Sequence, residues 1–502
     1  MRRRADVVRG LTIAAVALAA ASCGQPAGQA GQPVQSQAAE PQAAEPAQLA
    51  PPNTPLKAAD AEAALQVLSH VQDQGFAPNA FGDPEQISAE ARSADPDAQA
   101  KGQARLRHAV LAYARAQHGL GLPTTDFPKE WGMRPAKYDA DLDLRAAQGA
   151  GKVQDWLKAL PPPQPQYQAL VQALAAYRRI ATQGGWQPVP QGPVMREGSR
   201  DPRVQDLRNR LAVEDPAVAA QARDDAWDPA LTQAVLRFQA RYGLKNAGFV
   251  GPETYQALNV PIQARIDQIR VNLQRWRWAP RILPATRVEV NVPAFSMTYY
   301  KDGKPAMQML AAAGKPGDET PMLTSKITDI ELNPPWRIPK DIAEKEIYPK
   351  EKRDHGYFAR EQIVKGDSDA APLVQKAGPK SALGQVKFEF DSAYGVYLHD
   401  TPAKSAFNLA DRSVSHGCVR LQHAQDLAKA LLQTTPGWSP DQVDQAIATT
   451  DTKWVKLKEP VPVMLFYFTA YVEGGQVYLP PDPYGWDPIL LRLVDAGASS
   501  QA

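Results

Sequence analysis

The chain has 502 residues, enough for several domains rather than one hydrophobic core. Hydrophobic residues make up 44% and charged residues 22%, an ordinary globular mixture, and the formal net charge is only +2. Nucleic-acid-binding proteins usually carry a strong basic excess, so this balance gives no reason to expect a nucleic acid as a partner.

Residues 1–22 are typical of a signal peptide for export. Four arginines within residues 1–9 precede an apolar, alanine-rich run at 11–21, which is too short to cross a bilayer. Removing this segment takes away four arginines and one aspartate, which leaves a mature chain of about −1 net charge.

The chain contains two cysteines, Cys23 and Cys418. In an exported protein the two can form one disulfide. The sequence around Cys23, Ala-Ala-Ser-Cys-Gly, resembles instead the lipobox of bacterial lipoproteins, whose cysteine is acylated; plain cleavage nearby is the alternative. The resemblance implies a periplasmic protein held to a membrane only by a lipid anchor, and Gly24 favours the outer membrane. A lipidated Cys23 would leave Cys418 as a lone thiol in an oxidising compartment, which is a liability unless the thiol has a task.

The next part of the chain is predicted to be a tether followed by helices. Residues 23–57 are interpreted as a lipid-anchor site and flexible linker, because they are rich in Gln, Ala, Pro and Gly. Residues 58–195 are predicted to form a helical scaffold domain, since apolar residues recur at three- and four-residue spacing in 59–74, 104–118 and 167–183. Residues 261–285 are predicted to return to this scaffold as a further helix.

Residues 196–260 form a compact unit with its own helix signals. Asp228-Pro229 and Gly251-Pro252 are good helix starts. The runs AVLRFQ at 234–239 and GFVGPET at 248–254 closely resemble the peptidoglycan-binding type 1 module, a small three-helix domain. The resemblance implies docking to the cell wall.

From residue 286 the pattern becomes β-rich, which makes the whole chain a multidomain α+β protein. Residues 287–310 alternate around a KDGK hairpin signal at 301–304, and residues 461–480 are interpreted as a second hairpin through EGG at 473–475. We expect a β-rich domain over 286–436 and C-terminal helix and strands over 437–502. The segment at about 340–380, rich in Lys, Glu and Gly, is either an insertion that caps a cleft or a solvated surface loop.

The residues that can carry chemistry gather in 399–420, HDTPAKSAFNLADRSVSHGCVR. A thiol has a pKa of about 8.5, and a nearby imidazole can take its proton to leave a thiolate–imidazolium pair. His399 lies 19 residues before Cys418 and ends an alternating segment, so we expect a strand end to face the later loop. Gly417 lets backbone amides approach an oxyanion. Singly these residues are commonly structural; together they indicate acyl transfer.

This stretch also resembles the signature of the YkuD-type L,D-transpeptidases, a histidine followed some way on by [S/T]HGC. Here the signature is His399 and SHGC at 415–418, and NPPWRIP at 333–339 is similar to that family's N-P-x-W-x-x-P segment. The order of scaffold, peptidoglycan-binding module, YkuD domain and the later runs PVPVMLFYFTAYV and DPYGWD resembles the YcbB-like branch. Asp400 stands where many relatives have Gly, and Arg420 where smaller members have Asn.

The resemblance implies roles for each matched residue. Cys418 would be the nucleophile and His399 the general base and then acid. His416, Gly417 and the Cys418 amide would shape the oxyanion site, supported by Ser415. For the two departures the interpretation stays open. The Arg420 side chain would bind a stem carboxylate or brace the site, and Asp400 would orient His399 unless a backbone carbonyl does so.

The implied reaction is a 3→3 cross-link in peptidoglycan, made from a tetrapeptide donor stem through a cysteine acyl-enzyme, with no metal or other cofactor. Donor and acceptor stem peptides are the expected partners, other wall synthases are further candidates, and carbapenems are the expected trapping agents. The chain has no Ser-x-x-Lys or H-E-x-x-H motif, so penicillin-binding and zinc-peptidase classes lack their key residues. Two alternatives stay open: an L,D-carboxypeptidase or endopeptidase using the same site, and a non-catalytic peptidoglycan-binding adaptor.

Overall fold

The computed structural model describes residues 49–219, 224–366 and 371–501. The signal peptide, Cys23 and most of the linker lie outside these residues, so their assignments stay predictions. Within the described ranges, none of the helices combines the length and apolarity that a membrane span requires.

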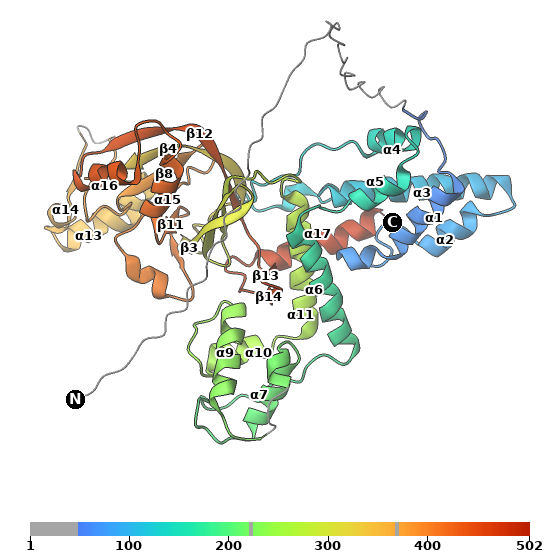
Figure 1. Ribbon diagram of the computed structural model, residues 1–502, viewed down its shortest axis with the longest axis horizontal. Helices are drawn as coiled ribbons and strands as arrows, with labels where there is room; N and C mark the ends of the chain where they lie inside the picture. Colours follow the sequence, from blue (N-terminus) through green and yellow to red (C-terminus); the bar gives the residue numbers. More distant parts are fainter. Residues whose placement is uncertain (1–48, 220–223, 367–370, 502) are drawn as a thin grey trace, which may run out of the picture. The chain divides into compact units, whose positions relative to one another are not determined.

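The N-terminal part is helical, as predicted (Figure 1). Its core is a cluster of small and aliphatic side chains, joined by Phe76, Phe81 and Tyr113, whose rings pack edge to face. The longest helix starts at Pro96 because the Asp95 side chain caps it and proline suits a first helical position. The elements are α1 (Ala58–Ser69), η1 (Val71–Gln74), α2 (Pro84–Ala91), α3 (Pro96–Gln117), η2 (Thr124–Asp126), α4 (Ala140–Gly149), α5 (Val153–Ala159) and α6 (Pro165–Thr182).

The next unit contains α7 (Arg203–Ala212), α8 (Pro216–Ala219), α9 (Pro229–Arg241) and α10 (Pro252–Leu258). Both predicted helix starts are confirmed: Asp228 accepts from the amide of Leu231 at 2.7 Å, and Gly251 precedes α10. The following helix, α11 (Ile262–Trp278), lies beside α6 (Figure 1).

A buried carboxylate links these helices to the rest of the chain. Glu214, at the end of the α7 region, forms ion pairs with Arg210 at 2.7 Å and Arg241 at 3.3 Å. Oε2 pairs with Arg210, whereas Oε1, which pairs with Arg241, also accepts from the hydroxyls of Tyr177 in α6 and Tyr242 after α9, at 2.5 and 2.7 Å. Burial alone would raise the pKa of Glu214, but the two guanidinium groups outweigh it and lower the pKa to about 2.

The second half of the chain is built on a nine-stranded sheet with the order β10-β3-β11-β9-β8-β4-β12-β1-β2. Because β2 also pairs with β3, the sheet closes on itself. The multidomain α+β class predicted from the sequence is confirmed. The strands are β1 (Arg287–Asn291), β2 (Ser296–Lys301), β3 (Lys304–Gly314), β4 (Leu323–Leu332), β8 (Val386–Phe390), β9 (Leu398–His399), β10 (Ser413–Ser415), β11 (Val419–Leu421) and β12 (Lys453–Phe466).

The two hairpin predictions had different outcomes. The first is confirmed: β2 and β3 join at Asp302 and Gly303, whose φ angles of 53° and 78° are those of a tight two-residue turn. The second is correct only at its tip, where β13 (Tyr471–Glu473) pairs with β14 (Gln476–Tyr478). The preceding residues belong instead to β12, which pairs with β4 and β1 inside the large sheet. Alternating apolar and polar residues indicate that a segment is a strand, but they do not indicate which strands it pairs with. The pairing of residues 453–466 with β4 and β1 therefore could not be predicted from the sequence.

Several helices accompany the sheet. The helix α15 (Ala424–Leu432) packs on β8 and β12 and against α16 (Pro440–Ala448), and the C-terminal α17 (Trp486–Gln501) packs on α11.

The segment near 340–380 has a small apolar core of its own, formed by Ile338, Ile342, Ala343, Ile347, Ile363 and Leu373. It contains a three-stranded sheet of β5 (Trp336–Arg337), β7 (Val374–Gln375) and β6 (Ile363–Val364). Its helices are α12 (Lys340–Ile342), the π-helical turn η3 (Ala343–Ile347), α13 (Tyr348–Arg353) and α14 (Tyr357–Arg360).

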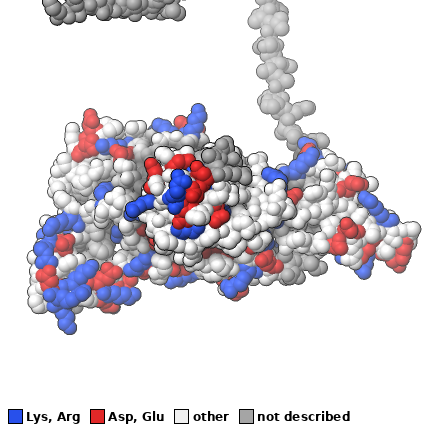
Figure 2. All heavy atoms as spheres, turned by 90° about the horizontal axis from the view of Figure 1, so that it is seen from below, with Lys and Arg blue, Asp and Glu red and all other residues white. Residues whose placement is uncertain are grey.

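Basic and acidic side chains are interspersed over the face that Figure 2 shows, in keeping with the near balance of 56 Lys and Arg against 54 Asp and Glu.

The Glu214 cluster generates a stability prediction. Glu214→Ala would leave two buried guanidinium groups without their carboxylate, so we expect a loss of about 3–5 kcal/mol in the free energy of unfolding, measured by urea denaturation with tryptophan fluorescence. The exposed pair Arg200–Asp225 offers a control, because Asp225→Asn should change stability by less than about 1 kcal/mol. A small effect of Glu214→Ala would contradict the assigned role.

The same carboxylate predicts a pH dependence. Because the pKa of Glu214 is lowered from 4.5 to about 2 on folding, its contribution is present above pH 4.5 and is lost as the pH falls toward 2. Wild-type stability should therefore fall more steeply over this range than that of Glu214→Gln, as measured by thermal melting at a series of pH values.

Candidate active site

Strand pairing brings His399 and Cys418 to one place. The strand β9 pairs in parallel with β11, so that Val419 lies opposite Leu398 and Arg420 opposite His399. Cys418 is the residue before β11, so in this parallel pairing it lies beside the start of β9. Both side chains line one cavity of about 490 Å³. The expected meeting of a strand end with the later loop is what the structure shows.

The His399 ring is buried and held by a backbone carbonyl. Its Nδ1 donates to the carbonyl oxygen of Asp400 at 2.5 Å. Burial, with the positive charge of Arg420 second, lowers the pKa of His399 to about 3. The imidazole is therefore neutral at physiological pH and able to accept a proton.

Cys418 is half-buried and contacts a tyrosine rather than the histidine. Tyr397 hydrogen-bonds Cys418, and the Tyr397 carbonyl also accepts from the amide of Val419 at 3.0 Å. Burial raises the pKa of the Cys418 thiol, and the hydrogen bonds from Tyr397 offset only part of that rise. Lys387 lies 4.1 Å from the centroid of the Tyr397 ring.

The resting site therefore differs from the thiolate–imidazolium pair expected from the sequence. In the described part of the chain, His399 bonds the Asp400 carbonyl and no hydrogen bond joins it to Cys418. Burial disfavours the charged form of both groups, so the thiol and the imidazole are both neutral. Catalytic hydrogen bonds in ligand-free sites commonly tighten only when substrate binds.

The loop that carries the thiol is fixed by its own hydrogen bonds. Ser415 is buried, and its hydroxyl donates to the Cys418 carbonyl at 2.5 Å and accepts from the Gly417 amide at 3.2 Å. Gly417 has a φ of +105°, which a residue with a Cβ adopts only under strain. The sequence-based roles of Ser415 as support and of Gly417 as a backbone position fit this geometry.

The His416 side chain points to the segment near 340–380. Its Nε2 lies 2.7 Å from Glu346 Oε1 and 3.5 Å from Lys315 Nζ. The hydrogen bond with His416 is the main reason that the pKa of Glu346 is lowered. Residues of this segment, including Ile342 and Tyr357, line the same cavity as Cys418.

Arg420 lines the cavity with a guanidinium that lacks a carboxylate partner. Its Nε is buried without a hydrogen bond, and no ion pair to this side chain occurs in the described ranges. Burial lowers the pKa of Arg420, which shows that the charge is held at a cost in solvation. An anionic ligand in the cavity would satisfy it.

The Asp400 side chain does not orient His399. Its carboxylate accepts from Lys404 Nζ at 2.6 Å and from the Gln385 amide at 3.0 Å, whereas its backbone carbonyl holds the imidazole. Of the two interpretations offered by the sequence, the carbonyl is correct.

Two neighbours of the site were missed in the sequence. Tyr397 had a usable signal, because it precedes His399 by two residues and side chains at that spacing share one face of a strand. Glu346 had none, since its contact with His416 joins residues 70 positions apart. Among the described residues, no group of three His, Cys, Asp or Glu side chains is arranged to hold a metal ion.

Three protein-family models match consecutive parts of the chain. The L,D-transpeptidase catalytic domain (YkuD) matches residues 285–443, the scaffold domain matches 54–174, and the model named "Putative peptidoglycan binding domain" matches 200–258. Over residues 285–443 the chain is therefore similar to the YkuD-type L,D-transpeptidase catalytic domain. Its domain order, scaffold then peptidoglycan-binding module then catalytic domain, is consistent with the YcbB-like branch.

A curated protein of Haemophilus influenzae named "Putative L,D-transpeptidase" is 31% identical over 238 residues, which cover 44% of this chain and 48% of the relative. The chain thus spans about half the length of that relative. An L,D-transpeptidase structure from Enterococcus faecium is 18% identical with a TM-score of 0.20, over 37% of this chain and 50% of that one. One from Mycobacterium smegmatis is 17% identical with a TM-score of 0.20, over 36% and 58%.

The neutral pair generates a prediction for thiol reactivity. In a Cys23→Ser background, the rate of Cys418 alkylation by iodoacetamide should rise with pH to a midpoint above the usual thiol value of about 8.5, because burial raises this pKa. His399→Ala should leave the profile nearly unchanged, since the imidazole does not bond the resting thiol. A plateau already reached near pH 6, abolished by His399→Ala, would instead demonstrate a thiolate–imidazolium pair.

Proposed function

We propose that the chain is an L,D-transpeptidase that forms 3→3 cross-links in peptidoglycan through an acyl-enzyme on Cys418. The observation that carries this proposal is the shared cavity, which brings together a thiol, a neutral imidazole and an unpaired guanidinium. The matched domains support peptidoglycan as the substrate class.

In the first half-reaction, Cys418 Sγ attacks the carbonyl carbon at the L-centre of the third stem residue. The lowered pKa of His399 keeps its ring unprotonated, so the ring can take the thiol proton. His399 then passes this proton to the departing amine. The C–S bond forms, the C–N bond breaks, and terminal D-Ala leaves as the amine. The charge on the tetrahedral oxygen is met by the Cys418 amide, in the loop that Gly417 and Ser415 shape.

In the second half-reaction, a side-chain amine of the third residue on a neighbouring stem attacks the thioester. The C–N bond forms, the C–S bond breaks, and the amine proton returns to the thiolate through His399. The Tyr397 phenol, already bonded to Cys418, steadies the sulfur while it is the leaving group.

The cavity also offers substrate recognition. The unpaired Arg420 guanidinium would bind a carboxylate of the stem, and charge-assisted pairs of this kind are the strong ones. The segment near 340–380 would cap the bound stem, because it lines the cavity and contacts the catalytic loop through Glu346 and His416. We further propose a periplasmic site of action, with Cys23 as the lipid anchor.

Product analysis tests the reaction. Purified protein incubated with tetrapeptide muropeptides should yield 3→3-linked dimers by mass spectrometry. Trimmed monomers alone would identify an L,D-carboxypeptidase, and unchanged substrate would favour a binding adaptor.

The nucleophile has its own test. A carbapenem should add its full mass to the wild type, and Cys418→Ala should abolish the adduct, because the thioester forms on that sulfur. Cys23→Ser is the matched control and should be acylated normally. An adduct that persists on Cys418→Ala would overturn the assignment.

The carboxylate role of Arg420 is tested by Arg420→Met, which keeps the length of the side chain but removes its charge. We expect the second-order rate constant for acylation by a carboxylate-bearing donor to fall about 10- to 100-fold, the range for a lost charge-assisted hydrogen bond. Lys429→Met, whose partner Asp444 is remote from the cavity, should be without effect. Equal rates for Arg420→Met and wild type would exclude a binding role.

A further inference from the structure

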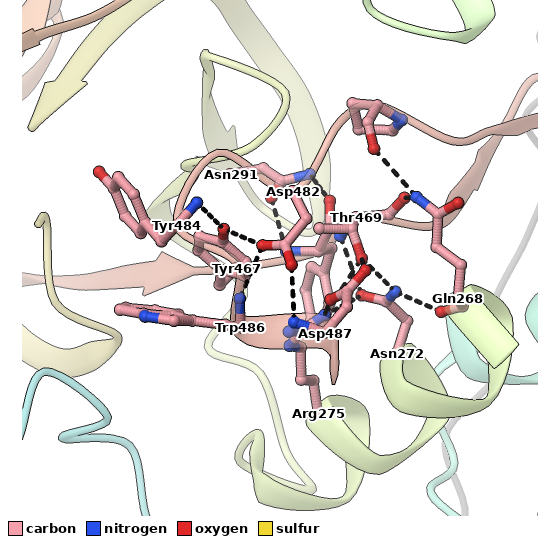
Figure 3. A network of polar contacts seen from close by, with 12 residues as sticks. Gln268, Asn272, Arg275, Asn291, Tyr467, Thr469, Asp482, Tyr484, Trp486 and Asp487 are labelled. Carbon is pink, nitrogen blue, oxygen red and sulfur yellow. Dashed lines mark hydrogen bonds and ion pairs between the residues drawn. The ribbon is translucent and has the colours of Figure 1, made fainter. Parts of the chain in front are cut away.

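The C-terminal run DPYGWD at 482–487 lines no part of the catalytic cavity, yet a continuous set of hydrogen bonds joins it to the thiol loop. Asp482 caps the start of α17, accepting from the amides of Trp486 at 3.0 Å and Asp487 at 2.7 Å. The Tyr467 hydroxyl donates to Asp482 and accepts from the amide of Tyr484 at 2.9 Å (Figure 3). The backbone before Tyr484 is thereby held in place.

The same run is fastened to the scaffold helix α11. Asp487 forms an ion pair with Arg275 at 2.6 Å, and the Thr469 hydroxyl donates to Asp487 at 2.7 Å. Asn272, one helical turn before Arg275, donates to the Thr469 hydroxyl at 2.7 Å (Figure 3). Arg275, Asn272 and Thr469 are all buried, so these bonds are shielded from water.

From this base the Tyr484 phenol reaches toward the catalytic domain. Its hydroxyl donates to the Gly314 carbonyl at 2.7 Å and accepts from the Thr320 amide at 3.1 Å. Thr320 is fully buried; its own hydroxyl accepts from the Gly314 amide at 2.8 Å and donates to the Gly417 carbonyl at 2.7 Å. Tyr484 therefore holds both the backbone of Thr320 and the residue that Thr320 contacts.

The last bond of this chain acts on the proposed oxyanion donor. A peptide unit is planar, so the Gly417 carbonyl and the Cys418 amide lie in one plane and point in opposite directions. A hydroxyl that fixes the carbonyl of Gly417 also fixes the direction of the Cys418 N–H. Gly417 has a φ of +105° and no Cβ, so no side chain at this position restricts the orientation of the Gly417–Cys418 peptide plane.

We propose that Tyr484 is a positioning residue, which acts through Thr320 to aim the Cys418 amide at the oxyanion. This inference rests on the proposed acyl transfer and adds to it a role for the C-terminal run and its scaffold anchor. A misaimed donor stabilises the tetrahedral intermediate less, while the sulfur and the cavity walls stay where they are.

The test compares two reactions of the same thiol in a Cys23→Ser background. Acylation by a carbapenem passes through an oxyanion, whereas alkylation by iodoacetamide does not. For Tyr484→Phe we expect the limiting rate of acylation to fall about 10- to 100-fold, with little change in the concentration for half-maximal rate. Alkylation should stay within about twofold of wild type, because no oxyanion donor takes part.

Companion variants sharpen the comparison. Thr320→Val should reproduce the acylation defect and Thr320→Ser, which keeps the hydroxyl, should restore most of the rate. Tyr113→Phe is the matched control, because it removes the phenol of another buried tyrosine, bonded to Gln117 in α3, far along the chain from the loop. It should acylate normally.

Acylation of Tyr484→Phe at the wild-type rate, or parallel losses of acylation and alkylation, would overturn the positioning role. A wild type that is alkylated but never acylated would mark the failure of the proposed function instead. In that case a crystal structure of Tyr484→Phe still decides the inference: a rotated Gly417–Cys418 peptide supports it, and an unmoved one refutes it.

Discussion

The parallel pairing of β9 with β11 is the constraint on which the site depends. It sets His399 opposite Arg420 and places Cys418 immediately before the start of β11. An imidazole, a guanidinium and a thiol therefore reach one cavity from two short strands and the loop before one of them. A shift of one residue would turn each of these side chains to the other face of the sheet. Backbone hydrogen bonds, rather than contacts among the reactive groups, therefore decide which side chains can work together.

Burial then sets the chemical state of the groups. It lowers the pKa of His399 to about 3 and raises that of Cys418, so neither carries charge before substrate arrives. In such a site the imidazole is free to accept a proton, and the thiol stays protonated and weakly nucleophilic. Arg420 holds its positive charge in the cavity without a carboxylate partner among the described residues, and an anionic ligand would satisfy that charge.

Local signals in the sequence predicted a good deal of this. The proline-marked starts of α9 and α10, the tight β2–β3 turn and the grouping of His399 with Cys418 all follow from residues close together in the chain. What could not be predicted depends on contacts between distant residues. The place of β12 in the sheet, the bond between Glu346 and His416, and the neutral state set by burial each require the folded packing. The sequence also could not predict which group of Asp400 holds His399. The backbone carbonyl of Asp400 bonds His399, whereas its carboxylate bonds Lys404.

The position of β12 in the chain has a consequence for assembly. This strand joins β4 to β1, both of which lie within residues 287–332, yet it comes only at Lys453–Phe466, far later in the chain. Until that late segment emerges, the ring of strands stays open, and ordering such sequence-distant partners costs chain entropy that no local contact returns. A polypeptide that stops before this strand thus contains Cys418 and His399 but has no closed sheet to align them.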